Sequence, residues 1–180
     1  MNSCLRGKYR KKNALLIYKN LESFVLKLFY DLNNQKYKHF GYNFFVNYDS
    51  KKRVIASACL KDKIVHRTLY NEMNFLIDKR YIYDSYACRN WKGTIAAIRR
   101  CQKFLRNRKL KYFLKMDVKK YFDSVDHLRL KKILKESNCL FDTILMTIDS
   151  YCIQKDKGIP IGNLTSQMFA NMYLNKLDVF

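Results

Sequence analysis

An apolar segment that ends in an acid constrains the fold more than any other part of the chain. Residues 112–116, Tyr-Phe-Leu-Lys-Met, lead directly into Asp117. A short apolar run of this kind predicts a buried strand. A carboxylate at the end of a buried strand is costly unless a positive group meets it. A magnesium ion carrying a phosphate would meet it, because Mg²⁺ binds one or two protein carboxylates and leaves room for substrate phosphates. An ordinary strand-end or turn residue is the alternative.

The charge of the chain indicates its kind of partner. Its 180 residues are 48% hydrophobic and 15% aromatic, which predicts one folded domain or most of a larger one. Lys and Arg number 36 against 15 Asp and Glu, a formal net charge of +21. Such an excess favours a polyanion. Because the basic residues recur along nearly the whole chain, we expect a long phosphate-bearing ligand; a generally basic protein or a membrane-surface binder is the alternative.

The cysteines and the lack of long apolar runs indicate the compartment. The six cysteines form no Cys-x-x-Cys pair and no zinc-ligand spacing, which predicts reduced thiols. No run is long enough for a signal peptide or a membrane span. We therefore expect a cytoplasmic protein with no membrane partner.

Helical periodicity recurs along the chain. A basic arm over residues 1–13 precedes apolar residues at helical spacing in four segments, 21–32, 64–76, 95–105 and 168–177. Thr94 is the expected N-cap of the third of these helices, and Asp126 or Ser124 is expected to cap another helix after residue 126. His66 is expected at the surface or against a strand, since no carboxylate partner is evident in the sequence.

Two strands and a turn predict a cationic hairpin. Residues 42–48 and 53–58 are rich in aromatic and β-branched side chains, and Asp-Ser-Lys-Lys between them is turn chemistry. Lys51, Lys52 and Arg53 would lie at or near the tip. Such a tip can hold a triphosphate or a nucleic-acid backbone, although exposed lysines at a turn are also ordinary.

Aromatic and basic residues precede the central acid. Residues 81–89 mix tyrosines with Arg89, a composition suited to stacking and phosphate contact or to core packing. The helix that follows carries a nearly all-positive surface. A solvated helix face normally mixes both signs, so this surface favours phosphate binding.

A glycine loop lies after the central acid. Gly158-Ile-Pro-Ile-Gly162 has unusual backbone freedom and precedes the last expected helix, which should begin near residues 163–166. Glycine at such a place allows a flat ligand to approach the backbone. A simple turn before a helix is the alternative.

In this order the segments resemble a reverse transcriptase of the bacterial and phage group II-like class. Residues 117–127 resemble its first palm motif, and residues 158–167 resemble its later loop between fingers and palm. The form Ile-Gly-x-x-x-Ser-Gln at residues 161–167 is most similar to reverse transcriptases of diversity-generating retroelements. Residues 53–58, 62–67 and 84–94 are similar to the same lineage, and the resemblance runs from about residue 40 to the C-terminus.

The resemblance implies an α+β fold, with helices packed on a small antiparallel sheet. It would be the fingers and incomplete palm of a right-hand polymerase. Residues 1–40 would form a basic arm and helix, residues 41–110 the fingers, and residues 111–180 a partial palm.

The resemblance also implies roles for particular residues. Asp117 would be the catalytic acid and, with the carbonyl of Val118, would hold two Mg²⁺ ions. The incoming dNTP would contact the cations Lys52 and Arg53, the steric gate Phe122, and Ile161 and Gly162. Template RNA and the primer or cDNA would contact Arg89, Lys92, Arg99, Arg100, Lys103, Ser166 and Gln167. Ser166 is also expected to hold the loop, as Asp123 and Asp126 hold the turn and the cap.

Two departures qualify the implied activity, template-directed addition of dNTPs to a primer 3′-OH. Ile161 stands where many relatives carry Gln, a change that accompanies error-prone copying in the family. The Tyr/Phe-x-Asp-Asp motif that supplies further metal ligands is absent, as is the thumb, so we expect a portion that is inactive alone. A small retroelement accessory protein is a possible partner. The alternatives are a non-catalytic RNA-binding module and a retron or intron-maturase polymerase.

Overall fold

The structure is a computed structural model that describes residues 12–49, 51–107, 111–137 and 142–179. The predicted basic arm lies mostly outside these residues, as do Arg108 and Lys109, two basic residues just after the helix predicted at 95–105. The elements are α2 (Lys12–Lys19), α3 (Leu21–Asn33), β1 (Tyr42–Tyr48), β2 (Lys52–Ala58), α4 (Leu60–Asp78), α5 (Thr94–Leu105), α6 (Tyr121–Ser124), α7 (His127–Glu136), α8 (Asp142–Asp149) and α9 (Leu164–Val179).

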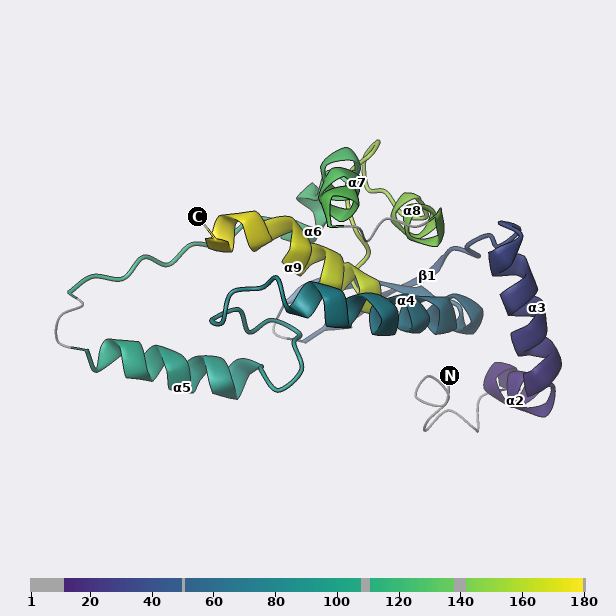
Figure 1. The fold of residues 1–180 in the computed structure, drawn as a ribbon, viewed down its shortest axis with the longest axis horizontal. Helices are drawn as coiled ribbons and strands as arrows, with labels where there is room; N and C mark the ends of the chain where they lie inside the picture. The colour runs from purple at the N-terminus through teal and green to yellow at the C-terminus, as the bar shows by residue number, and fades with distance from the viewer. Residues whose placement is uncertain (1–11, 50, 108–110, 138–141, 180) are drawn as a thin grey trace.

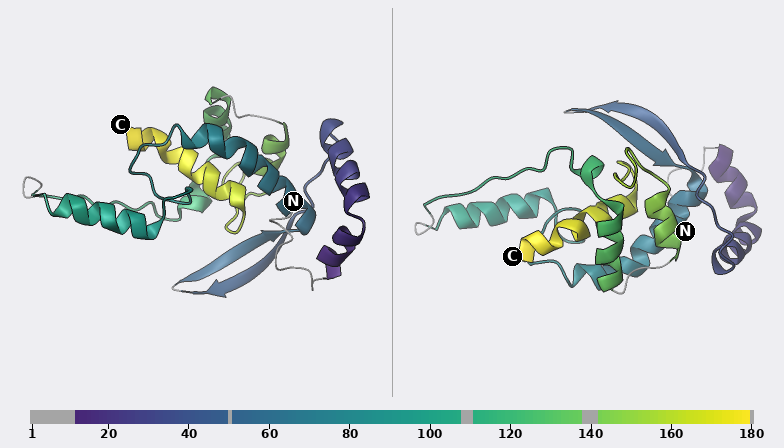
Figure 2. Two further views of the ribbon diagram at one scale, coloured as in Figure 1. Left: turned by 60° about the horizontal axis from the view of Figure 1, so that its bottom comes forward. Right: turned by 90° about the horizontal axis from the view of Figure 1, so that it is seen from above.

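The hairpin is confirmed. Strands β1 and β2 pair antiparallel, from Tyr42 opposite Ala58 to Tyr48 opposite Lys52, so the cations do lie at its tip. Figure 2 shows the hairpin projecting from the helices. Only the base of β2 is covered, where Ala56 and Ala58 are buried. The helices therefore pack mainly on one another, and the sheet is covered at one end alone.

The core lies between α4, α7, α8 and α9. Figure 1 shows α9 lying along α4, with α7 and α8 beside it. Their apolar faces meet in one cluster, whose fully buried members include Met73, Ile77, Leu130, Leu134, Ile144, Ile148 and Phe169. A smaller cluster of Leu28, Tyr37, Ile64 and Val65 holds α3 against the start of α4. The predicted helices at 21–32, 64–76 and 168–177 are thus confirmed, each slightly longer than its apolar pattern.

Helix α5 forms as predicted but does not pack as predicted. Gly93 occupies the N-cap position instead of Thr94, and none of the helix's residues is buried. Ile95 and Ile98, expected on its inner face, are 68% and 52% exposed. Figures 1 and 2 show why: the helix extends away from α4 and α9.

The predicted buried strand at residues 112–116 is wrong. Residues 111–118 have no helix or strand, and Tyr112 and Phe113 are 93% and 83% exposed. A strand persists only where a neighbouring strand satisfies its backbone groups. Among the described residues, β1 and β2 pair with each other and no strand lies beside this segment. Residues 112–116 have the sequence pattern of a strand, but no described strand lies beside them to form its hydrogen bonds.

Within the described ranges, no helix combines the length and the apolarity that crossing a bilayer requires.

Candidate nucleotide and nucleic-acid interface

The glycine loop is tied to the short helix α6 by its backbone. The N–H of Gly158 donates to the carbonyl of Val125 at 2.8 Å, and that of Ile159 donates to the carbonyl of Phe122 at 2.9 Å. His127, buried at the start of α7, contacts the carbonyl of Gly158 through Nε2 at 2.7 Å. Because a carbonyl only accepts, the proton of this imidazole lies on Nε2. These bonds hold Phe122 beside the loop.

The other end of the loop is docked on the hairpin. The N–H of Ala56 in β2 donates to the carbonyl of Ile161 at 2.8 Å. Gly162 has φ +122°, and a Cβ there would lie 2.8 Å from Cγ2 of Ile55 and 3.0 Å from the carbonyl oxygen of Ala56. Only glycine fits this backbone and this contact. The loop therefore joins the Phe122 segment to the base of the hairpin.

Phe122 has a firm support. It lies half-buried in α6, with its ring edge-on to Tyr121 at a centroid distance of 5.9 Å. The Tyr121 hydroxyl donates to the carbonyl of Ala170 in α9 at 2.5 Å, and burial raises the pKa of that hydroxyl. Helix α6 is thus anchored to α9 through Tyr121, and the ring of Phe122 packs at the edge of the core cluster.

The hairpin cations lie further out on the same strand. Lys52 and Arg53 are exposed, opposite Tyr48 and Asn47 of β1. Lys52 is four residues from Ala56, about 13 Å along an extended strand. The structure therefore brings Phe122, Ile161 and Gly162 together and places the two cations on an arm that extends from them.

Asp117 lies on the exposed segment that leads into α6. Lys120 turns the chain there with a left-handed backbone, φ +49°. Asp117 is exposed, and Val118 beside it is 45% exposed. Within the described residues, no lysine or arginine pairs with the Asp117 carboxylate. The carboxylate is available to a ligand.

The described residues do not build a two-metal site by themselves. Among them, no three His, Cys, Asp or Glu side chains are grouped so that they could hold a metal ion. Two ions bridged by substrate need more than one carboxylate. Asp117 therefore fits as one ligand of such a site, and the set is incomplete on these residues.

Arg89 has a different environment from the one that its predicted role requires. Its Nε lies 2.7 Å from Oδ1 of Asp78, and its Nη1 donates to the carbonyls of Ile82 and Ser85. The hydrogen bond from the Arg89 guanidinium to Asp78 holds the pKa of that carboxyl below its usual range. With its donors engaged in this way, the guanidinium organises the loop between α4 and α5.

The other predicted phosphate contacts divide into two groups. Arg100 pairs with Asp84 at 2.8 Å, and Lys92 donates to the carbonyl of Tyr83. Arg99 and Lys103 are exposed on α5 and pair with no acid among the described residues. These two side chains are therefore the freest of the predicted set to meet a phosphate.

Ser166 and Gln167 lie in the first turn of α9. Ser166 is 2% exposed, so its hydroxyl is covered by protein. Gln167 is half-buried and accepts a hydrogen bond from the thiol of Cys88. Gln167 thus joins α9 to the loop that carries Cys88.

Sequence reasoning missed a buried polar network next to the loop. Asp62, 0% exposed in the first turn of α4, accepts from the Tyr37 hydroxyl at 2.7 Å and from the N–H of Phe40 at 3.0 Å. His66, expected at the surface or against a strand, is buried one turn later in α4. The acid and the histidine, four residues apart among apolar neighbours, were the available signal of a shared inward face.

The hydrogen bonds of this network define the histidine tautomers. Nδ1 of His39 accepts from the N–H of Gly41, so its proton lies on Nε2, which faces Nε2 of His66 at 3.3 Å. His66 then donates through Nδ1 to Thr165 at 2.8 Å and also accepts from the Asn163 amide. Burial lowers the pKa of His66 to about 4. The network thus joins α4 to the residues that follow the glycine loop.

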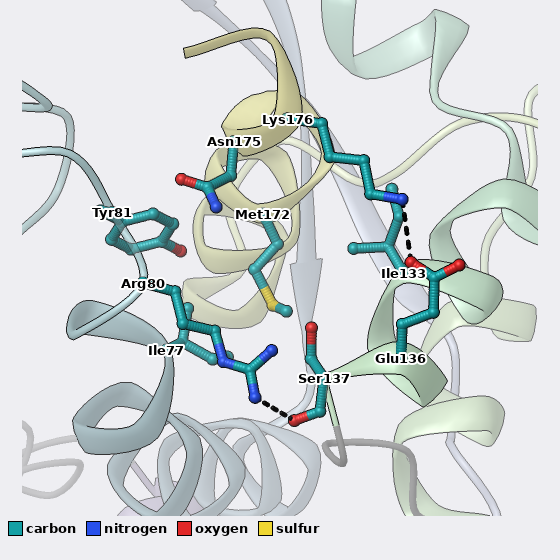
Figure 3. Close-up of a pocket in the computed structure, with 9 residues that line it drawn as sticks. All are labelled: Ile77, Arg80, Tyr81, Ile133, Glu136, Ser137, Met172, Asn175 and Lys176. Carbon is teal, nitrogen blue, oxygen red and sulfur yellow. Dashed lines mark hydrogen bonds and ion pairs between the residues drawn. The ribbon is translucent and has the colours of Figure 1, made fainter. Parts of the chain in front are cut away.

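A small pocket lies on another side of α9. It has a volume of about 210 Å³. Figure 3 shows it between the ends of α4, α7 and α9. Arg80 donates to the carbonyl of Ser137 at 3.0 Å, and Lys176 pairs with Glu136 at 2.9 Å. Its charged groups are therefore engaged with protein partners, and none of the predicted site residues lines it.

Comparison with known proteins identifies the family of this chain. The family model described as reverse transcriptase (RNA-dependent DNA polymerase) matches residues 46–179. The "Putative COX1/OXI3 intron 2 protein" of Saccharomyces cerevisiae is 24% identical over 130 residues, which cover 67% of this chain and 15% of the yeast protein. The match includes β2 with the end of β1, the exposed acid and the glycine loop, and the chain belongs to the reverse transcriptase family.

Proposed function

We propose that this chain is the part of an RNA-directed DNA polymerase that holds the incoming nucleotide against template and primer. The docking of the glycine loop on β2 carries the proposal. In support, Ile161 and Gly162 lie beside the base of a cationic hairpin, and the neighbouring Ile159 donates its N–H to the backbone carbonyl of Phe122, an aromatic residue. Such a surface offers a flat backbone for a base pair and an aromatic wall for a sugar.

Each proposed role follows from position. Lys52 and Arg53, exposed on the hairpin, would hold the triphosphate of a dNTP. Phe122 would stand against the sugar and exclude a ribose 2′-OH. Asp117, exposed and unpaired, would provide one carboxylate near the reacting phosphate, with the carbonyl of Val118 beside it.

The chain spans 15% of the length of the yeast relative. We therefore also propose the complete reaction. In that reaction a primer 3′-OH attacks the α-phosphate of the dNTP and pyrophosphate leaves. Two-metal catalysis of this step requires carboxylates additional to Asp117. The contribution of the described residues is to bind, align and select the nucleotide.

The lineage is also a proposal. Residues 161–167 favour the error-prone enzymes of diversity-generating retroelements, whereas the relative found in yeast is named as an intron protein. An apolar side chain at Ile161 removes a hydrogen-bonding group beside the nascent pair. In a polymerising form of the protein, Ile161→Gln should lower misincorporation opposite template adenine. Unchanged errors there would favour the intron-type alternative.

One experiment separates catalysis from binding alone. The 180-residue chain is mixed with a primed RNA template, dNTPs and Mg²⁺, and both complex formation and primer extension are measured. Binding that weakens steeply with added salt is expected. Extension that is lost in Asp117→Ala, with unchanged folding, would establish the catalytic role. Binding without extension would assign this chain to the second candidate, a non-catalytic RNA-binding module, which the incomplete metal-ligand set of the described residues favours.

A further inference from the structure

Trp91 has an exposed ring and a left-handed backbone, both of which are unfavourable for a tryptophan. It is the only tryptophan in the sequence, and its residue is 100% exposed. Its backbone is left-handed, with φ +61°. An indole gains most from burial, and a left-handed backbone is unfavourable for a residue with a Cβ. The chain therefore maintains a fully exposed aromatic ring at a strained position.

The loop around this ring is built firmly. Two residues before it, Arg89 bonds to Asp78 and to the carbonyls of Ile82 and Ser85. One residue after it, Lys92 donates to the carbonyl of Tyr83. Because both sides of Trp91 are anchored, its exposure is a feature of the folded loop.

The ring borders a groove along the second half of α4. The groove has a volume of about 540 Å³ and is lined by Tyr70, Asn71, Asn74, Phe75, Asp78, Lys79, Asn90 and Trp91. Phe75 is 65% exposed, and the ammonium of Lys79 lies 3.9 Å from the centre of its ring. Three aromatic side chains therefore share one open surface with a cation.

The polar groups of the groove suit nucleobases. Three asparagine amides offer both donors and acceptors, the combination that base edges require. Lys79 supplies a positive charge for a phosphate, and Arg67 lies one turn of α4 before Asn71. The acid Asp78 is already paired with Arg89 at 2.7 Å. Glu72, exposed on the neighbouring helix face, is the remaining opposing charge.

We propose that this groove binds unpaired bases of single-stranded RNA, which stack on Trp91 and Phe75. The proposal rests on the proposed function, since a polymerase that copies RNA meets unpaired template. A protein of formal charge +21 favours a polyanionic occupant over a neutral peptide. Exposed aromatic faces select unstacked bases, because bases within a duplex already cover their faces.

The single tryptophan makes the test direct, since its fluorescence reports on this groove alone. The chain is titrated with a single-stranded oligoribonucleotide, with a duplex RNA of the same length and with polyphosphate. Quenching by the single strand alone is expected. Trp91→Ala should weaken single-strand affinity about 5- to 150-fold, the range measured for loss of one stacking platform. Trp91→Phe should retain most of that affinity.

Controls separate stacking from general changes. Phe40→Ala removes another exposed aromatic ring outside the groove and should leave single-strand affinity unchanged. Duplex affinity and the thermal unfolding midpoint should be the same in Trp91→Ala and the parent chain.

Failure of the groove proposal and failure of the proposed function give different results. If the chain binds RNA but the fluorescence is unquenched and Trp91→Ala binds single strands as tightly as the parent, the groove proposal is overturned and the proposed function stands. If the chain binds no RNA, both are overturned. A fluorescence change that follows protein concentration alone would assign the groove to a second copy of the chain and would also overturn the proposal.

Discussion

The N–H of Ala56 donates to the carbonyl of Ile161 at 2.8 Å, and this bond makes the glycine loop an edge partner of the hairpin. Within the hairpin, Ala56 stands opposite Phe44. An antiparallel strand directs alternate N–H groups toward and away from its partner. The N–H of Ala56 faces away from β1, and the loop satisfies it. A shift of the hairpin base would therefore move the loop.

Gly162→Ala should break this junction. The added methyl would lie 2.8 Å from Cγ2 of Ile55 and 3.0 Å from the carbonyl oxygen of Ala56, on a backbone of φ +122°. We expect a loss of about 2–4 kcal/mol in the free energy of unfolding, because clash and backbone strain combine. Urea unfolding followed by circular dichroism measures it.

Gly93→Ala is the matched control. Gly93 has φ +124°, but a Cβ there would meet nothing within 4 Å. It should cost only the backbone strain, about 1–3 kcal/mol. Equal losses in the two variants would show that contact with β2 is unimportant.

The sequence predicted those helices and strands whose formation depends on a pattern within one segment. The hairpin turn and the apolar stripes of α3, α4 and α9 are encoded within single segments, and these elements formed as expected. Residues 112–116 carry an equally clear strand pattern but remain without a strand. Their state depends on a pairing partner, which no local pattern supplies.

In the candidate site, too, the sequence predicted some features and not others. The glycines of the loop predict its backbone freedom, and that backbone sets the positions of Ile161 and Gly162. The partners of Arg89 and Arg100 are Asp78 and Asp84, at separations along the chain of 11 and 16 residues, and the sequence does not indicate which cations will be paired. Charge runs therefore predict a basic surface but not which of its members are free.

Asp62→Ala should destabilise the fold strongly. It would leave the buried Tyr37 hydroxyl and the N–H of Phe40 without an acceptor. Each unsatisfied buried donor costs roughly 1–3 kcal/mol, so a loss of about 3 kcal/mol is expected. Tyr37→Phe removes the hydroxyl itself, so no buried donor is left without an acceptor, and it should cost about 1 kcal/mol. Urea unfolding measures both variants.

Glu72→Ala tests whether the effect belongs to the network. Glu72 is an exposed acid on the same helix, so its removal should change the free energy of unfolding by less than about 0.5 kcal/mol. A loss as small in Asp62→Ala would refute the structural role of the buried acid.

Stability should fall as the pH is lowered from 6.5 toward 4. The pKa of His66 is about 4 in the folded chain, because burial disfavours its charged form and the neighbouring His39 adds to that effect. The unfolded chain binds a proton first, so acid favours unfolding. This histidine alone should remove about 3 kcal/mol across that window. Burial also lowers the pKa of His39, which acts in the same direction.

The contribution of His66 is isolated by comparison with His66→Gln. The other titrating groups are common to both chains, so the variant should lose less stability between pH 6.5 and 4. Identical pH profiles would contradict the assignment. If the variant does not fold, NMR titration of the parent gives the same answer: the His66 ring signals should not titrate above pH 5.

Arg99 and Lys103 should account for part of the salt dependence of RNA binding. Both are exposed on α5 and unpaired among the described residues. The double change Arg99→Ala with Lys103→Ala should weaken RNA binding regardless of sequence. It should reduce the slope of log affinity against log salt by about 1–2, since each lost phosphate contact releases fewer counterions. Lys176→Ala removes a cation already paired with Glu136 at 2.9 Å and should leave that slope unchanged. Fluorescence anisotropy over a salt series measures the slopes, and equal slopes in all three proteins would place the RNA away from α5.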